Sequence, residues 1–185
     1  MRGHESITIT HAEAQHLPFM RKMLYEAIYI PPGESRPDET IIEDPRIMKY
    51  IQDWKLPSDC GCIAYVEGTA IGAAWSRLLN PQNPGYGYVA PHIPELCMAV
   101  LPECRAKGVG TLLLENLFQE LQSKGYSQLS LSVDQRNRAA ELYLRVGFTL
   151  LETRETDYVM VREIIAAACP PREFLHHHLH SDSTR

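Results

Sequence analysis

The residues whose types and spacing suggest chemistry lie between Glu95 and Phe148. The run VLPECRAKGVGT, residues 100–111, places two glycines and two cations where a predicted strand gives way to the longest predicted helix. The first N–H groups of a helix have no intrahelical acceptor, and with the helix dipole behind them they form an anion site suited to a diphosphate. Arg105 and Lys107 add positive charge at this turn.

Two other phosphate-binding motifs do not fit this run. A Walker A loop requires Gly-x-x-x-x-Gly-Lys-Ser/Thr, which does not occur in the sequence. A dinucleotide fingerprint requires Gly-x-Gly-x-x-Gly after the first strand of a βαβ unit, whereas Leu113 stands where the third glycine belongs. Both interpretations therefore fail.

Hydrophobic periodicity predicts the elements that would position this turn. Alternating apolar residues predict strands, and apolar residues three and four positions apart predict helices. The predicted strands cover residues 6–10, 62–66, 70–79, 95–100, 129–133, 148–153 and 156–161, and the predicted helices 12–29, 45–54, 108–124 and 137–146. The longest helix carries an apolar stripe of Val109, Leu112, Leu113, Leu117 and Leu121. This order predicts an α/β fold, a mixed central sheet flanked by helices in a single domain.

Composition limits the class of protein. A formal net charge of −5 argues against nucleic acid or an anionic membrane as a partner. No apolar run is long enough to span a bilayer, and the amino terminus lacks the apolar core of a secretory signal. Five irregularly spaced cysteines match neither a redox pair nor a zinc site, so we expect reduced thiols in a cytoplasmic protein and no metal.

Two motifs in this region resemble the GNAT superfamily of N-acetyltransferases. Residues 105–110, Arg-Ala-Lys-Gly-Val-Gly, match the family signature Arg/Gln-x-x-Gly-x-Gly/Ala at the start of its central helix. Residues 137–148, Asn-Arg-Ala-Ala-Glu-Leu-Tyr-Leu-Arg-Val-Gly-Phe, match a later family segment that carries Asn, Ala, Leu-Tyr and Gly-Phe in this order. The resemblance is sharp from Glu95 to Phe148 and only architectural before that. It implies a GNAT-like fold and acetyl-CoA as the co-substrate.

The resemblance also implies roles for individual residues. The strand edge at Met98, Ala99 and Val100 would pair with the pantetheine arm of acetyl-CoA, and Asn137 would contact the coenzyme near the second strand. Tyr143 would act as general acid and give its proton to the departing thiolate. The diphosphate would be held by the backbone amides of one turn: Arg105, Ala106, Lys107, Gly108, Val109, Gly110 and Thr111.

The implied reaction needs a base as well as an acid. An alkyl ammonium group has a pKa of about 10.4 and must lose a proton before its nitrogen attacks, whereas a departing thiol of pKa about 8.5 needs a proton donor. Glu95, at the start of the central strand beside the Pro-rich segment 80–94, is the first candidate for the general base, acting through a water. His92 is the second candidate. A backbone amide near Met98 is the candidate oxyanion donor.

The sequence therefore predicts an N-acetyltransferase that moves an acetyl group from acetyl-CoA to a primary amine by direct attack. A small-molecule acceptor is preferred over a peptide because long loops can enclose a pocket, and transfer of a longer acyl chain stays open. The alternative class is a non-catalytic acetyl-CoA sensor or regulatory module, against which Tyr143 argues. The final strands suggest a homodimer. We expect the domain to cover residues 1–162, followed by a disordered or loosely packed tail, 163–185, with four histidines between 176 and 180.

Overall fold

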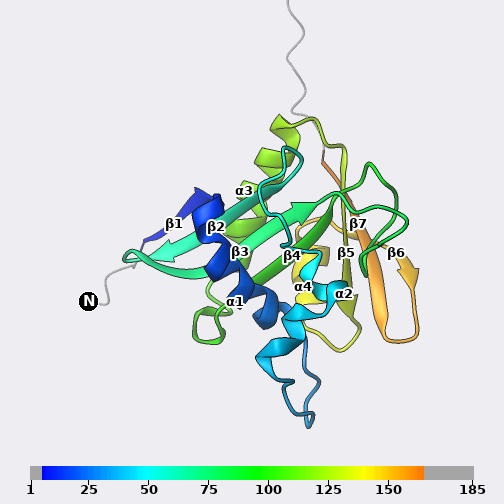
Figure 1. Cartoon of the computed structure of the whole chain (residues 1–185), viewed down its shortest axis with the longest axis horizontal. Helices are drawn as coiled ribbons and strands as arrows, with labels where there is room; N and C mark the ends of the chain where they lie inside the picture. The colour runs from blue at the N-terminus through cyan, green and yellow to red at the C-terminus, as the bar shows by residue number, and fades with distance from the viewer. Residues whose placement is uncertain (1–5, 165–185) are drawn as a thin grey trace, which may run out of the picture.

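The central feature of the fold is a mixed sheet of seven strands in the order β1-β2-β3-β4-β5-β7-β6 (Figure 1). The computed structural model describes residues 6–164. All neighbouring strands are antiparallel except β4 and β5, which are parallel. The predicted α/β fold with a mixed sheet in a single domain is therefore confirmed. The strands are β1 (Ile7–His11), β2 (Cys60–Val66), β3 (Thr69–Arg77), β4 (Glu95–Val100), β5 (Gln128–Asp134), β6 (Thr149–Thr153) and β7 (Asp157–Glu163).

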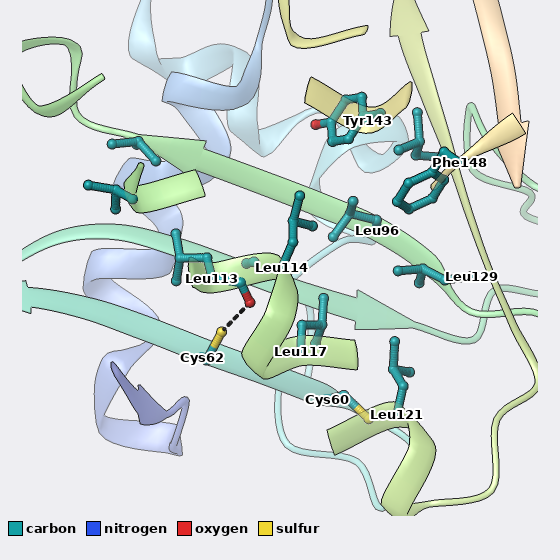
Figure 2. Close-up of a cluster of buried hydrophobic side chains, with 14 of the residues drawn as sticks. Cys60, Cys62, Leu96, Leu113, Leu114, Leu117, Leu121, Leu129, Tyr143 and Phe148 are labelled. Carbon is teal, nitrogen blue, oxygen red and sulfur yellow. Dashed lines mark hydrogen bonds between the residues drawn. The ribbon is translucent and has the colours of Figure 1, made fainter. Parts of the chain in front are cut away.

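Helices within the described residues cover both faces of this sheet (Figure 1). They are α1 (Leu17–Ala27), α2 (Pro45–Met48), α3 (Val109–Ser123) and α4 (Ala139–Arg145). The apolar stripe of α1 packs with Ile63 and Trp75 in a core on one face. The leucines of α3 pack on the opposite face in a second core, which also contains Tyr143 and Phe148 (Figure 2). Apolar side chains at three- and four-residue spacing along each helix produce this burial.

The two parallel strands diverge in the middle of the sheet. β4 and β5 share one paired position, Glu95 with Ser130, next to which the Ser130 amide donates to the Pro94 carbonyl at 3.0 Å. After that position β4 pairs with β3, and β5 pairs with β7. Within residues 6–164, one edge of β4 is therefore left beside a gap instead of a neighbouring strand.

The predicted elements match the observed ones in order. The helix predicted over residues 12–29 is a 3-10 turn at Ala14–His16 followed by α1, and two further differences concern α2 and α3. The sequence predicts a helix over residues 45–54, but α2 ends at Met48 and residues 49–53 form turns, with Asp53 at a left-handed φ of 51°. The predicted stripe of α3 includes Leu112, but Leu114 is buried in its place and Leu112 is only half-buried. Both differences change which side chains reach the core, and neither moves a strand of the sheet.

Some predictions fall on residues that the structure does not describe. The tail predicted at residues 163–185 lies outside the described residues from 165 onward, and so do its four histidines. The domain boundary at 162 also stays a prediction. Within residues 6–164, no helix has the length and apolar character needed to cross a membrane, and no group of three or more His, Cys, Asp or Glu side chains is arranged to hold a metal ion.

Candidate active site

The unpaired edge of β4 presents main-chain groups to the gap beside β5. The amide of Leu101 donates to the Ile71 carbonyl at 2.8 Å, on the β3 side. Because main-chain groups of successive strand residues point to opposite sides, Met98 and Val100 direct theirs toward β5. Arg105 takes up one of them, since its Nε donates to the Val100 carbonyl at 2.9 Å. The N–H and C=O groups of Met98 therefore face the gap.

Ala99, which was predicted to share this edge, lies between the two outward-facing positions. It pairs with Ala73 of β3, so the same alternation directs its main-chain groups away from the gap. Of the three predicted edge residues, Met98 and Val100 thus have main-chain groups on the side of β5.

The predicted diphosphate turn lies between β4 and α3. A 3-10 turn at Pro102–Cys104 leads into it, Ala106 and Gly108 adopt left-handed φ angles of 59° and 83°, and α3 begins at Val109. The first amide of the helix with a main-chain acceptor is that of Leu112, which donates to the Gly108 carbonyl at 3.1 Å. The structure records no acceptor within residues 6–164 for the amides of residues 106–111. Such a series of unpaired amides at a helix start is an anion site.

The side chain of Arg105 ties this turn to α1. Its Nη2 lies 3.2 Å from Glu26 Oε2, and Arg36 Nη1 contacts the same oxygen at 3.4 Å. The Arg105 side chain is nevertheless 51% exposed. The guanidinium is thus held by Glu26 of α1 and by the Val100 carbonyl of β4, while about half of the side-chain surface stays exposed at the turn, where it adds positive charge.

The helix α4 lies beside the gap, on the face of the sheet that α3 covers. Asn137 Oδ1 accepts the Ala139 amide at 2.9 Å, so this side chain caps the helix start as predicted. A Cβ atom added to Gly110 would lie 3.1 Å from Leu142 Cδ2 and 3.6 Å from Met98 Cε. The start of α3, the edge of β4 and the helix α4 therefore pack closely at Gly110, where an added Cβ would require the Leu142 side chain to shift by a few tenths of an ångström.

Tyr143 follows Leu142 on α4 and is part of the core beneath α3. It is 8% exposed, and its ring meets that of Phe148 edge-on with centroids 5.6 Å apart. Figure 2 shows the phenol oxygen on the side of the ring away from Phe148. Burial raises the pKa of Tyr143, and the nearby Cys97 thiol raises it further. The phenol therefore keeps its proton at neutral pH, as a general acid must.

Glu95, at the start of β4, is buried, although a carboxylate at the end of a strand is usually solvated. The residue is only 3% exposed. Its Oε1 accepts hydrogen bonds from the Tyr50 hydroxyl at 2.5 Å and from the Gly87 amide at 2.7 Å. Oε2 is buried without a hydrogen-bond partner among the described residues. Burial raises the pKa of Glu95, and the two donors, with the cations of Lys49 and Arg154, only partly offset this effect.

The loop 80–94 covers Glu95, and sequence reasoning missed how it does so. A Cβ atom at Gly85 would overlap Glu95 Oε2, and one at Gly87 would overlap the β5 main chain at Leu131 and Ser132. The Gly-Tyr-Gly run at 85–87 is the signal in the sequence for this close approach. His92, the second candidate base, lies on the same loop with its side chain exposed. The structure therefore joins Glu95 to Tyr50 and Gly87, residues that the sequence did not single out for the site.

Comparison with known proteins finds similarity to N-acetyltransferases. The profile of the Acetyltransferase (GNAT) family matches residues 21–148. Over 61 residues, 33% of its length, the chain is 38% identical to the ribosomal protein bS18-alanine N-acetyltransferase of Haemophilus influenzae. The chain spans 42% and 58% of the lengths of two curated relatives that it matches.

Solved structures share the fold. The PaiA N-acetyltransferase of Thermoplasma acidophilum, in complex with coenzyme A, has a TM-score of 0.61 at 20% identity and covers 85% of this chain and 99% of its own. The ribosomal-protein-S18-alanine N-acetyltransferase of Escherichia coli has a TM-score of 0.60 at 22% identity, over 91% of this chain and 100% of its own. The family profile covers more than half of the chain, including both motifs that carried the resemblance. The chain therefore belongs to the acetyltransferase (GNAT) family.

Proposed function

We propose that the chain transfers an acetyl group from acetyl-CoA to a primary amine. The proposal rests on three features beside the gap between β4 and β5: the outward main-chain groups of Met98, the amides of residues 106–111, which are unpaired within residues 6–164, and the buried Tyr143 of α4, which lies near Cys97 of β4. A pantetheine arm contains amides that can pair with a strand edge, and a diphosphate is the kind of anion that a helix start binds. These residues therefore suit acetyl-CoA as co-substrate, and the proposed reaction uses no metal.

The proposed chemistry is direct attack without a covalent enzyme intermediate. The amine nitrogen attacks the thioester carbonyl, so that a C–N bond forms and the C–S bond breaks. The Met98 amide stabilises the oxyanion that develops on the carbonyl. The departing thiolate takes the proton of the Tyr143 hydroxyl, and the proton lost by the amine passes through water to Glu95 Oε2.

We propose a small-molecule amine as the acceptor. Support comes from the long loops beside the gap, which are fixed by contacts distant in sequence: the Tyr29 hydroxyl donates to the Arg136 carbonyl at 3.1 Å, and Arg154 Nη1 donates to the Tyr86 carbonyl at 2.6 Å. The second candidate is the terminal amine of a peptide. It is favoured by the local identity to an enzyme whose name specifies an alanine of a ribosomal protein.

An assay of free coenzyme A tests this function. The panel contains polyamines, amino acids, aminoglycosides and peptides with free amino termini, and acceptor-dependent release above the hydrolysis background is expected for one class. Binding of acetyl-CoA without release on any acceptor supports the alternative, a non-catalytic sensor. Repeating the assay with propionyl-CoA and longer thioesters tests the acyl chain. The proposal includes a cytoplasmic location, because the described cysteines are free thiols, and a homodimer stays a prediction for a mass measurement in solution.

Charge reversal at Arg105 tests the turn. We expect Arg105→Glu to weaken acetyl-CoA binding about fivefold, since an exposed ion pair contributes about 1 kcal/mol. The loss should shrink in 0.5 M salt, because salt screens exposed charges. Arg105→Gln is the matched comparison, because it keeps an N–H donor for the Val100 carbonyl but lacks the charge, so it should lose most of the same affinity. Calorimetry with acetyl-CoA measures both variants, and equal affinities for Arg105→Glu and wild type would contradict a charge contribution.

A further inference from the structure

One hydroxyl group, that of Tyr50, joins the start of β4 to the loop 80–94. It donates to Glu95 Oε1 at 2.5 Å and accepts the Tyr86 amide at 2.8 Å. Tyr50 is 7% exposed, and its own carbonyl accepts the Trp75 indole N–H at 2.8 Å. Because the hydroxyl has both an acceptor and a donor fixed by the fold, its O–H bond has one orientation, toward the carboxylate.

The two carboxylate oxygens of Glu95 differ in their hydrogen bonding. Oε1 receives two donors, Tyr50 and the Gly87 amide, which matches the two lone pairs of a carboxylate oxygen. Oε2 is buried with no partner among the described residues. A buried oxygen left unpaired costs about 1–3 kcal/mol, so this oxygen is not explained by stability. It is the one with capacity for a proton.

The loop is held over this carboxylate from several elements. Lys49, in the turn after α2, donates to Asn83 Oδ1 at 2.9 Å and also bonds the Pro84 carbonyl. Arg154, between β6 and β7, donates to the Tyr86 carbonyl at 2.6 Å. The Tyr50 and Tyr86 rings lie parallel with centroids 6.5 Å apart. The loop and the carboxylate therefore belong to one hydrogen-bond network, in which Tyr50 contacts both.

We propose that Tyr50 is a positioning residue for acetyl transfer, whose hydroxyl holds Glu95 so that Oε2 alone receives the proton of the amine. The inference rests on the proposed function. It assigns to Tyr50 no contact with either substrate. Its effect on the reaction passes through Glu95.

The effect of removing the hydroxyl on pH dependence has a definite sign. The groups that face Glu95 are Tyr50, the cations of Lys49 and Arg154, and the half-buried Cys97 thiol on the same face of β4. Burial raises the pKa of Glu95, and the Tyr50 hydrogen bond is the largest effect that lowers it. Without that donor the pKa rises further. A base acts only when ionised, so the acid limb of kcat/KM moves to higher pH.

The test compares two tyrosine-to-phenylalanine variants. Tyr50→Phe should lower kcat about tenfold, within the range that positioned acid–base groups contribute. It should also shift the acid limb upward and leave the KM for acetyl-CoA unchanged. Tyr126→Phe, which removes a hydroxyl that donates to the Ser58 carbonyl at 3.2 Å, should change none of these quantities. An unmoved acid limb in Tyr50→Phe would overturn the proposal, even with a lower kcat.

A double variant separates positioning from a purely structural role. Glu95→Gln keeps oxygen and shape but removes the proton acceptor, so adding Tyr50→Phe to it should cost little more activity. Losses that multiply would show that Tyr50 acts independently of Glu95, and full activity of Glu95→Gln would show that the carboxylate only anchors the loop. Either outcome overturns the inference. If Tyr50→Phe does not fold, Glu95→Asp, which withdraws the carboxylate from the hydroxyl by one methylene, should show the same tenfold loss.

Failure of this inference differs from failure of the proposed function. If the wild-type chain releases no coenzyme A with any acceptor, the transferase itself is wrong. If the wild-type chain is active and Tyr143→Phe impairs it while Tyr50→Phe keeps the wild-type pH profile, only the role of Tyr50 is wrong.

Discussion

Tyr143→Phe is expected to lower kcat by about 100-fold, the lower part of the range for a positioned general acid, with little change in affinity for acetyl-CoA. The phenyl ring keeps its edge-on contact with Phe148, so the α3 core remains packed and only the proton donor is lost. Because burial raises the pKa of Tyr143 above its usual value near 10, the acid form persists into the alkaline range. Activity that depends on this proton should be lost only as pH rises above that raised pKa, so wild-type kcat should stay level to about pH 9.

The measurement is single-turnover release of coenzyme A, with binding followed separately by calorimetry. Tyr126→Phe is the matched control, since it also removes a phenol hydroxyl, one that donates to the Ser58 carbonyl outside the gap. A role in packing alone predicts the opposite pattern. In that case Tyr143→Phe lowers the unfolding temperature while kcat stays within twofold of wild type.

The parts of the site that the sequence predicts are built from residues close together in the chain. The turn at 105–110 follows from glycines at a helix start, and Gly108 has the left-handed φ that its position requires. Asn137 caps the helix that was predicted from it, and Gly147, at φ 93°, ends that helix. Hydrogen bonds and backbone conformations within a few residues determine these features, so the turn and the two ends of the helix can be predicted from the sequence.

The parts that the sequence does not predict depend on contacts between distant residues. Glu95 is a buried carboxylate because Tyr50, 45 residues earlier, donates to it, and no local pattern links the two. The predicted helix 45–54 ends early for the same reason. Residues 49–53 form hydrogen-bonded turns that end at the left-handed Asp53, and Lys49 and Tyr50 in these turns reach the loop 80–94. Tertiary hydrogen bonds thus outweigh helix propensity at the point where the candidate base is held.

Gly108→Val is expected to weaken acetyl-CoA binding by about 30- to 100-fold, which corresponds to about 2–3 kcal/mol. Gly108 has a φ of 83° and no atom within 4 Å of a Cβ at this position, so the variant meets no clash. A β-branched residue resists positive φ, and the backbone must turn away from its present conformation. The amides of residues 106–111 then no longer point together. Each charge-assisted hydrogen bond to the diphosphate contributes about 1.5–3 kcal/mol, so losing one accounts for the effect.

The chain contains a matched control for this strain. Gly68, in the turn between β2 and β3, has a φ of 77° and equally open surroundings, but lies in a hairpin away from the start of α3. Gly68→Val and Gly108→Val should therefore lose similar unfolding free energy, of about 1–2 kcal/mol for a bulky residue at positive φ. Only Gly108→Val should lose affinity for acetyl-CoA in calorimetry. Of the two variants, only Gly108→Val is expected to change the direction of the amides of residues 106–111. If Gly108→Val nevertheless binds acetyl-CoA as tightly as wild type and Gly68→Val do, the helix start does not hold the diphosphate.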